Sequence, residues 1–442
     1  MGGYGTYICK NRTDYLKPSS MKIFKFGGAS VNSVDRIKNL SSIIASHNQE
    51  QLVIIVSAMG KTTNGLEKVV DAYFKGNKEE ALQLFNVVKN QHLTTAKYLL
   101  VLQYNECVQQ LNDFFTEVEW LLHDKPVRNY DYYYDQIVCT GELFSTCIIS
   151  HFLKEEKIAN QWLDVRDLLR TDNNFRDAGV QFDFSTSRIK TAIAENSSKI
   201  TITQGFIGAT DDNESTTLGR EGSDYTAAIF ANILDASELT IWKDVEGVMN
   251  ADPKSYPDAQ LIKELNFNEV IEMAYYGAQV IHPKTIKPLQ NKNIPLLVKC
   301  FLDPTLEGTI IHHKHVKNLP PIIVNKERQV LMHLKTKDFS FIGEEPMSIL
   351  YQIFGEIKVK PNLIQTGAIS LQLCLDDHEE KIGMLAEKCS HLFDVQIEKL
   401  LTLITIRHYN EEIIGTLLTN KQILLQQKTR ETIQTIYRTQ LS

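Results

Sequence analysis

The chain has 442 residues, with 47 Lys and Arg against 54 Asp and Glu, so its formal net charge at pH 7 is −7. A single hydrophobic core rarely exceeds about 250–300 residues, so we expect at least two domains. The acidic balance argues against nucleic-acid binding, which requires a basic face. The seven cysteines form no CxxC pair, which argues against a disulfide framework or a zinc site and favours a reducing compartment.

The N-terminal 20 residues lack the apolar core of a secretory signal and are predicted to form a polar extension ahead of the first strand. No stretch of the chain reaches the roughly 18 apolar residues that a membrane-spanning helix requires. We therefore expect a cytoplasmic protein that contacts no membrane.

Apolar runs alternate with helical periodicity as far as about residue 312. Buried strands are predicted over 21–26, 52–57, 200–208, 238–242 and 295–299. Helices are predicted after a cap at Ser33, over 65–123, over 137–151, over 223–234 with Ser223 as the cap, and over 267–277. The aromatic and charged tract 128–136 is predicted to be a surface loop. Apolar strands between helices indicate an α/β fold, with a mostly parallel sheet covered by helices on both faces.

The pattern changes after the basic, proline-ending segment 313–321, where we place a domain boundary. Strands and helices then follow in the ferredoxin-like order strand-helix-strand-strand-helix-strand. The last 35 or so residues are predicted to form a second, shortened α+β unit. The predicted organisation is an extension over 1–20, a first domain over 21–314 and a second region over 322–442.

The segment KFGGAS (25–30) has the composition of a phosphate-binding turn. Its glycines let backbone N–H groups approach phosphate oxygens, the following helix favours an anion, and Lys25 adds a positive charge. By itself, this segment is equally well explained as a simple connection between strand and helix. The segment MGKT (59–62) resembles the end of a Walker A loop, but position 55 is Ile rather than Gly, so we reject that interpretation.

The segment TTLGREGSD (216–224) is the densest local signal. Arg220 can clamp a carboxylate through paired hydrogen bonds, and Asp224 can orient an ammonium group, a lysine or a metal ion. The alternative is a capped helix with a surface ion pair. The segment WKDVEGVM (242–249) follows a strand, at the sheet edge where open α/β folds bind ligands, although a plain glycine turn is equally compatible. Glu142 begins an apolar helix, where a carboxylate often only stabilises the helix end.

Taken in order, these segments resemble the aspartokinases of the amino acid kinase superfamily over about residues 21–312. The motifs that carry the resemblance are KFGGAS, VSAMGKTTN, TGE, WLDVRDLLRTD, ITQGFIG, TTLGREGSDYTAA, WKDVEGVMNADP, EMAYYGAQVIHP and EGTII. The C-terminal part is similar, through looser motifs, to the tandem ACT regulatory modules of that family. The resemblance implies phosphorylation of L-aspartate to 4-phospho-L-aspartate with ATP and Mg²⁺, the first step of lysine, threonine and methionine biosynthesis, by a homodimer or larger homo-oligomer.

The resemblance also implies roles for individual residues. Lys25 would neutralise charge on the transferring phosphoryl group and Asp224 would organise the catalytic charges, while no protein ligand to the metal is assigned. The implied substrate contacts are Ser57, Thr63, Glu142, Arg220, Gly222 and Ser223. The implied ATP contacts are Lys25, Gly27, Gly28, Ser30, Lys243, Asp244, Met249, Lys254, Gln279 and Val280.

Several positions depart from the family pattern. Glu221 stands where the family usually has glycine, Lys243 and Ala29 replace threonine, and Gln279 replaces lysine. None of these changes removes a presumed catalytic group.

The regulatory region also departs from the family. In its lysine-sensitive members an aspartate receives the amino group of the effector, and Asn362 stands there, four residues before Thr366. The effector implied by the resemblance is lysine or threonine, and the loss of a carboxylate predicts weak inhibition by lysine.

Two other functions remain open from the residues alone. Another amino acid kinase, acting on acetylglutamate, glutamate or carbamate, generally lacks a paired ACT tail and a GREGSDYTAA-type segment. A catalytically inactive amino-acid sensor would have no need for Lys25, Arg220 and Asp224, all of which are present. At this length, we expect no fused homoserine dehydrogenase.

Overall fold

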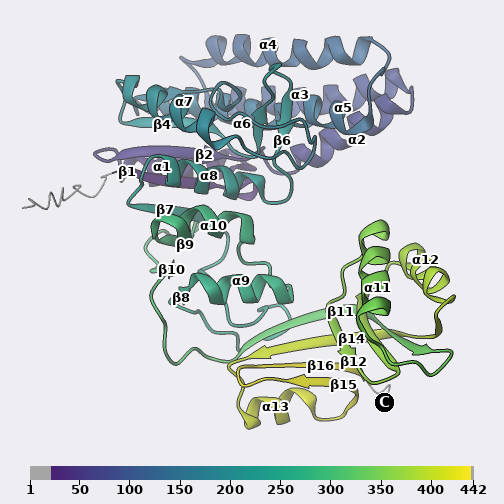
Figure 1. Ribbon diagram of the computed structural model, residues 1–442. Coiled ribbons are helices and arrows are strands. Elements are labelled where there is room, and N and C mark those ends of the chain that lie inside the picture. Colours follow the sequence, from purple (N-terminus) through teal and green to yellow (C-terminus); the bar gives the residue numbers. More distant parts are fainter. Residues whose placement is uncertain (1–20, 440–442) are drawn as a thin grey trace, which may run out of the picture. The chain divides into compact units, whose positions relative to one another are not determined.

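The computed structural model describes residues 21–439, which form two compact units (Figure 1). The first unit runs to Glu246 and resumes over Lys284–His313. The second unit comprises Gly247–Pro283 and the chain from Lys314 onward. The predicted extension over 1–20 lies outside the described residues. The compact units group Gly247–Pro283 with the C-terminal region, whereas the sequence pattern includes this segment in the first domain.

The first unit is built on a mostly parallel β-sheet. Its strands lie in the order β3 (Asn160–Trp162), β4 (Ile200–Gln204), β2 (Gln51–Val56), β1 (Met21–Phe26), β7 (Glu238–Lys243), β9 (Leu296–Cys300) and β10 (Thr309–His312). Each neighbouring pair is parallel except β9 and β10. Five consecutive residues of β2 are buried, which means that both of its faces are covered and explains its uninterrupted apolar sequence.

Helices pack against this sheet, with α6 on β2 and β4 and α8 on β1, β2 and β7 (Figure 1). The helices are α1 (Val34–Ala45), α2 (Thr62–Phe74), α3 (Lys78–Leu99), α4 (Tyr104–His123), α5 (Tyr130–Val138), α6 (Thr140–Glu155), α7 (Phe182–Glu195), α8 (Gly222–Ile233) and α10 (Pro283–Lys292). Short 3₁₀ turns cover Gly28–Val31 and Val165–Asp167, and β5 (Ile207–Ala209) pairs with β6 (Ser215–Thr217). The predicted α/β fold is confirmed.

Three local predictions need correction. The tract 128–136 is not a surface loop, because α5 occupies most of it and buries Tyr133, Tyr134 and Asp135. Ser223 does not cap α8, since the helix already begins at Gly222 and its N-cap is the preceding residue. The single helical stretch predicted over 65–123 is divided among three helices. By contrast, Ser33 caps α1 as expected, accepting a hydrogen bond from the Arg36 N–H at 3.3 Å.

The helical stretch over 130–155 also corrects the expectation about membrane spans. By length and composition it is apolar enough to cross a membrane, and 94% of its most apolar window is buried inside the protein. It contains α5 and α6, and every residue of α6 from Thr140 to Leu153 is buried. These helices therefore form part of the core of the first unit.

The second unit contains an antiparallel sheet. Its strands lie in the order β12 (Leu363–Thr366), β13 (Ser370–Asp376), β11 (Ile322–Thr336), β14 (Phe393–Arg407), β16 (Thr432–Thr439) and β15 (Lys421–Lys428). Along the chain, β11, α11 (Glu344–Ile357), β12, β13, α12 (Glu379–Cys389) and β14 follow the predicted ferredoxin-like order. One apolar core joins both helices to the sheet through residues that include Met332, Leu350, Leu373 and Leu385.

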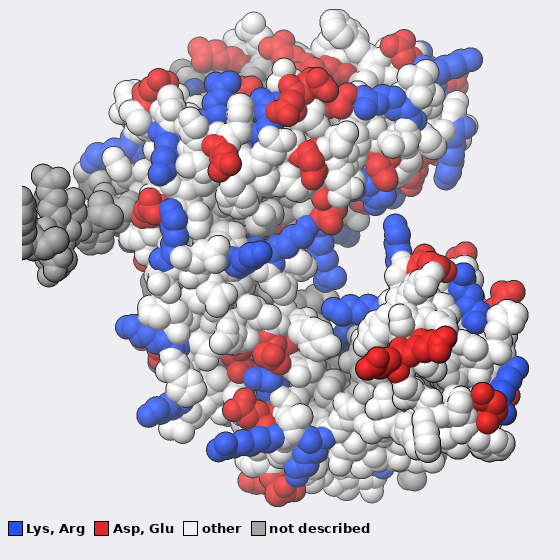
Figure 2. All heavy atoms as spheres, viewed as in Figure 1, with Lys and Arg blue, Asp and Glu red and all other residues white. Residues whose placement is uncertain are grey.

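The remaining elements of the second unit form a second apolar cluster. Ile404 and Ile433 from the sheet pack with Leu418 of α13 (Glu411–Leu418) and with Ala251. Ala251 precedes β8 (Glu264–Asn266) and α9 (Phe267–Tyr276). This shared cluster is the reason that the segment following Glu246 packs with the C-terminal sheet. On the face shown in Figure 2, basic and acidic side chains are interspersed over both units.

Candidate active site

A cavity of about 420 Å³ opens in the first unit where the parallel strands end. Ser57 directly follows β2, Phe206 lies just after β4, and Glu142 and Asp224 stand in the first turns of α6 and α8. Its lining residues are Lys25, Ser57, Thr63, Tyr134, Glu142, Arg176, Phe206, Thr217, Gly219, Arg220, Glu221, Gly222, Ser223 and Asp224. The carboxyl ends of parallel strands are the usual ligand-binding edge of such a fold.

Lys25 and Asp224 form an ion pair in the lining of this cavity. The Lys25 Nζ lies 2.7 Å from Asp224 Oδ1, and the two side chains are only 11% and 5% exposed. Lys25 is the fifth residue of β1, and Asp224 is fixed by the first turn of α8, so both come from rigid elements. A pair held this way presents charge to a ligand without having to reorganise first.

The glycine turn after β1 is packed closely against the turn after β2. A Cβ on Gly28 would lie 2.6 Å from the carbonyl oxygen of Ala58, so only glycine fits at this position. The Gly60 N–H donates to the Gly28 carbonyl at 3.0 Å, and the Ser30 N–H donates to the Gly27 carbonyl at 2.9 Å. The predicted phosphate-binding turn is therefore a rigid, hydrogen-bonded turn next to Lys25.

Glu142 has one satisfied and one unsatisfied carboxylate oxygen. Its Oε1 accepts a hydrogen bond from the Ala58 N–H at 3.1 Å, whereas Oε2 is buried and has no hydrogen-bond partner among the described residues. Burial raises the pKa of Glu142 to about 8, although the Ala58 N–H and the Lys25 charge act in the opposite direction. A buried acceptor without a partner is costly unless a ligand supplies a donor.

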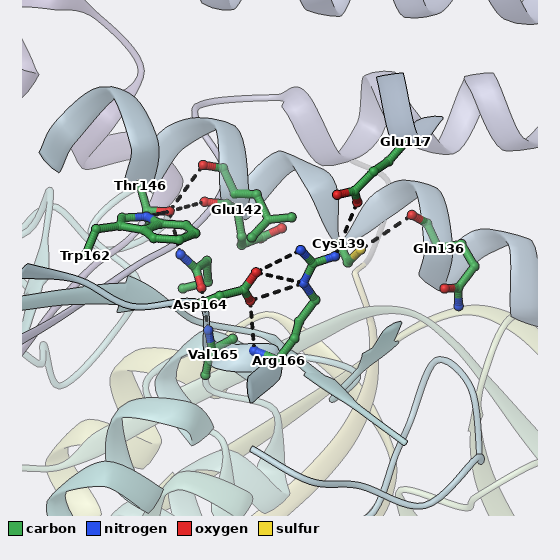
Figure 3. Close-up of polar contacts among 11 residues, drawn as sticks. Glu117, Gln136, Cys139, Glu142, Thr146, Trp162, Asp164, Val165 and Arg166 are labelled. Atoms are coloured by element: carbon green, nitrogen blue, oxygen red, sulfur yellow. Dashed lines mark hydrogen bonds and ion pairs between the residues drawn. The ribbon is translucent and has the colours of Figure 1, made fainter. Parts of the chain in front are cut away.

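A polar network holds the backbone of Glu142 in place (Figure 3). The Thr146 hydroxyl donates to the Glu142 backbone carbonyl at 2.8 Å and accepts from Trp162 Nε1 at 3.0 Å. Nearby, Asp164 accepts hydrogen bonds from the Arg166 guanidinium at 2.8 and 3.1 Å. Neither Asp164 nor Arg166 lines the cavity, so the WLDVRD motif is part of the scaffold that holds α6 in place.

Arg220 lines the cavity with an exposed side chain that forms no hydrogen bond or ion pair within residues 21–439. It lies between two residues with left-handed backbone, Gly219 at φ 75° and Glu221 at φ 54°. Glu221 also lines the cavity. Left-handed backbone favours glycine, which gives a physical reason for the glycine that the family usually has where this chain has Glu221.

The structure thus brings together every residue that the sequence predicted to act in catalysis or in substrate binding. Thr63 is the second residue of α2, and it lines the same cavity as Ser57. Gly222 and Ser223 begin α8, where a Cβ on Gly222 would lie 2.7 Å from the Phe206 ring. The roles of these residues stay predictions.

Sequence reasoning missed Asp135, which organises one wall of the cavity. Its fully buried carboxylate accepts hydrogen bonds from the Thr217 N–H at 2.8 Å, the Thr217 hydroxyl at 2.7 Å and the Arg176 N–H at 3.0 Å. Burial raises the pKa of Asp135 to about 6 despite these donors. The repeat of Tyr and Asp four residues apart in YDYYYD (130–135) is a helical spacing that could have revealed α5.

Lys243 and Asp244, both predicted ATP contacts, lie in the first unit at the end of β7. Both carboxylate oxygens of Asp244 are 2.8 Å from Arg36 Nη1, which also donates to the Ala29 carbonyl at 2.9 Å. Arg36 was not identified from the sequence, and it links Asp244 to the glycine turn.

The other four predicted ATP contacts lie in the second unit. Met249 forms an isolated bridge with Leu261, and Lys254 is exposed. Gln279 is exposed and Val280 half-buried, just after Gly277 ends α9 with a φ of 109°.

Asn362, the predicted regulatory residue, is enclosed by polar partners. Its Oδ1 accepts from Lys326 Nζ at 2.6 Å, and its Nδ2 donates to Gln329 Oε1 at 2.8 Å and to Asp376 Oδ1 at 2.9 Å. Thr366, at the end of β12, is exposed.

No group of three or more His, Cys, Asp or Glu side chains within residues 21–439 could hold a metal ion alone. In the cavity, Asp224 offers one buried carboxylate beside Lys25. Mg²⁺ commonly takes one or two carboxylates and completes its coordination with nucleotide phosphates and water. The residues present therefore fit a metal ion that binds together with a nucleotide.

Comparisons with known proteins identify the family of this chain. The model of the amino acid kinase family matches residues 20–300. Lysine-sensitive aspartokinase 3 of Escherichia coli is 30% identical over 81% of this chain and 79% of that protein. The crystal structure of E. coli aspartokinase III in complex with aspartate and ADP has a TM-score of 0.78 at 26% identity, covering 94% of this chain and 96% of that chain. The chain therefore belongs to the amino acid kinase family, and within that family to the aspartokinases.

Some curated relatives are much longer. A bifunctional aspartokinase/homoserine dehydrogenase of Arabidopsis thaliana is 31% identical over 67% of this chain. This chain spans about a third of the length of that protein, since the match covers 33% of it.

Proposed function

We propose that this protein transfers the γ-phosphoryl group of ATP to the β-carboxylate of L-aspartate, giving 4-phospho-L-aspartate and ADP. The observation that carries the proposal is a cavity that combines the Lys25–Asp224 pair with Arg220 and Glu142 Oε2, neither of which has a partner among the described residues. The E. coli relative whose structure was solved with aspartate and ADP supports the same acceptor and nucleotide.

The charged groups of the cavity complement those of aspartate. The ammonium group of the substrate would donate to Glu142 Oε2, which has no partner within the described residues. The α-carboxylate would take two parallel hydrogen bonds from the Arg220 guanidinium, a geometry that suits arginine. With these two groups fixed, the β-carboxylate is the part of the substrate left free to react.

Phosphoryl transfer to a carboxylate requires positioning and charge neutralisation more than proton transfer. An oxygen of the β-carboxylate attacks the γ-phosphorus, and the bond from that phosphorus to the β-phosphate oxygen breaks as ADP leaves. The acceptor is already ionised near neutral pH, so no general base is needed. Lys25 would lower the repulsion between the acceptor and ATP.

Mg²⁺, when bound with ATP, would supply further positive charge at the phosphates, and Asp224 would be the side chain that holds it. The glycine turn at Gly27, Gly28 and Ser30 would contact the phosphates. The other proposed ATP contacts are Lys243, Asp244, Met249, Lys254, Gln279 and Val280. Arg36, paired with Asp244, would keep the charge of that carboxylate away from the phosphates.

In the cell, we place this enzyme in the cytoplasm as a homodimer or larger homo-oligomer, with lysine as the first effector to test. The six described cysteines are free and buried, which fits a reducing compartment. The lysine-sensitive E. coli relative motivates the choice of effector.

Glu142 distinguishes this proposal from phosphorylation of acetylglutamate or carbamate. Neither of those acceptors carries a free ammonium group that could satisfy Glu142 Oε2. The test is an acceptor panel in which hydroxylamine traps acyl phosphate, with and without ATP. We expect hydroxamate from L-aspartate at least tenfold faster than from glutamate, and none from acetylglutamate or carbamate. Faster reaction with any of these three would reject aspartate as the acceptor.

A further inference from the structure

The loop over 172–179 presents Arg176 to the cavity from a rigid frame. The Asp172 N–H donates to the Gly179 carbonyl, and the Asp172 Oδ1 accepts from the Gly179 N–H, both at 2.9 Å, which closes the loop. Within it, Arg176 has a left-handed backbone, with φ at 70°, and its N–H is fixed by the buried Asp135. A fully buried carboxylate that holds an arginine in an unfavourable conformation indicates that the position of this residue matters.

The guanidinium of Arg176 is held in place, but only part of its hydrogen-bonding capacity is taken up by the described residues. Its carbon lies 4.4 Å from the ring centre of Tyr134, which also lines the cavity. Only Asp131 accepts a hydrogen bond from it among the described residues, at 3.0 Å from Nη1. Both side chains of this ion pair are about half exposed, and exposed ion pairs are weak. Asp131 therefore competes only weakly with an anion that binds to Arg176. Arginine has five donors, which leaves several for a ligand.

The loops that carry Arg176 and Arg220 touch each other. A Cβ on Gly219 would lie 3.2 Å from the Arg176 carbonyl oxygen, so Gly219 allows the close approach. Both arginines line the cavity, and the remaining cation of its lining, Lys25, is paired with Asp224. Two guanidinium groups therefore face a site that contains Glu221 as an additional acid.

We propose that Arg176 is a second carboxylate-recognising cation of the acceptor cavity, and that it favours an acidic amino acid by offsetting the charge of Glu221. This inference rests on the proposed function, because it assumes that the acceptor is aspartate. A purely structural role, in which Arg176 only joins its loop to α5, is the alternative. The two roles differ in what removal of Asp131 should do.

The test compares steady-state kinetics of four variants with those of the wild type. Arg176→Met should raise KM for aspartate about five- to tenfold, as expected for a lost charge-assisted hydrogen bond, and leave KM for ATP within about twofold. The KM of Arg176→Lys for aspartate should lie between those of the wild type and Arg176→Met. Asp131→Asn removes the competing anion, so KM for aspartate should stay the same or fall. The salt dependence of KM should be weaker in Arg176→Met than in the wild type.

Arg128→Met is the matched control. Arg128 stacks on Tyr132 at 3.7 Å and pairs with Glu214, but it does not line the cavity, so KM for aspartate should not change. The inference is overturned if Asp131→Asn raises KM as much as Arg176→Met does, or if Arg176→Met leaves KM unchanged. An inactive wild type would instead reject the proposed function, so the two failures are distinguishable.

Discussion

At the scale of single residues, the proposed activity depends on a few buried charges that have specific partners. The ion pair of Lys25 and Asp224 is nearly buried, and a buried pair is expensive to desolvate. Structural stability alone is a weak reason to keep such a pair. A role in neutralising the transferring phosphoryl group is a stronger one.

The Lys25→Met variant tests this role directly. Loss of a positive charge that acts in the transition state costs several kcal/mol, so kcat should fall by roughly 10³ or more. Binding of ATP, measured by calorimetry, should weaken much less. The far-ultraviolet circular dichroism spectrum serves as the control for folding, since Met can fill the same space along β1. Turnover within tenfold of the wild type would remove Lys25 from the mechanism.

Glu142 predicts a pH dependence of substrate binding. Its pKa is raised to about 8 by burial, above its ordinary value of 4.5, so it is protonated in the free protein near neutral pH. Only the ionised form attracts the ammonium group of aspartate. The KM for aspartate should therefore fall as the pH rises from about 6.5 to about 8.5, and the Glu142→Gln variant should show a higher KM that no longer varies with pH.

The same shift predicts how the stability of the ligand-free protein varies with pH. Between about pH 4.5 and 8, Glu142 binds a proton in the folded state but not in the unfolded state. The stabilisation of the folded state by this proton is fully present below pH 4.5, and it is lost as the pH rises through 8.

For substrate binding, a flat pH profile of KM in the wild type would contradict the assignment of Glu142 to the ammonium group.

At the scale of elements, the core strands β1, β2, β7 and β9 and the start of α1 could be predicted because their signals are local. The apolar run of β2 and the Ser33 cap of α1 are examples. The helix α5 could not be recognised by composition, because its Tyr and Asp side chains are buried by partners distant in sequence, such as Thr217 and Glu67. Ser223 has the chemistry of a cap, but the N-cap of α8 is the left-handed Glu221, two residues earlier, and the helix begins at Gly222.

Among the site residues, motif spacing identified those on strand ends and helix starts. Arg36, Asp135 and Arg176 were missed because their importance comes from contacts between segments 40 or more residues apart. Such contacts leave no pattern in a single sequence.

Glu221 gives a prediction about the start of α8. A non-glycine residue at φ 54° carries a strain of roughly 1 kcal/mol, which glycine does not. The Glu221→Gly variant should therefore unfold at a higher denaturant midpoint, with an unchanged m-value. It should also lower KM for aspartate, since an acid is removed from the cavity. Glu221→Gln separates the two effects, because it removes the charge but keeps the strained backbone.

A higher KM in Glu221→Gly would show that Glu221 assists binding.

At the scale of the whole molecule, the predicted regulatory residue Asn362 lies next to the sheet of the second unit. The amide of Asn362 already has partners on both ends, and its oxygen is bound by the ammonium group of Lys326. A free lysine that used this amide would have to displace Lys326. The stem of Lys326 also passes over Gly277, where a Cβ would lie 2.4 Å from Lys326 Cε.

We therefore predict weak inhibition of the wild type by lysine. The sequence alone predicts that Asn362→Asp strengthens inhibition, but the new carboxylate would pair with Lys326. Only the double variant with Lys326→Met should gain lysine sensitivity, by roughly tenfold for one charge-assisted bond. Lys360→Met, which removes a neighbouring lysine stacked 5.0 Å from Tyr275, is the control. Strong inhibition of the wild type at sub-millimolar lysine would disprove this account of Asn362.

The central claim is that this chain joins the β-carboxylate of aspartate to the γ-phosphorus of ATP. The most direct measurement uses L-aspartate labelled with ¹⁸O in the β-carboxylate, with hydroxylamine to release phosphate from the acyl phosphate and ³¹P NMR to read the label. Because hydroxylamine attacks the carbonyl carbon, the bridging oxygen leaves with phosphorus. We expect phosphate that carries one ¹⁸O atom with the wild type and not with Lys25→Met. Unlabelled phosphate from the wild type would mean that ATP is hydrolysed by water, and it would contradict the claim.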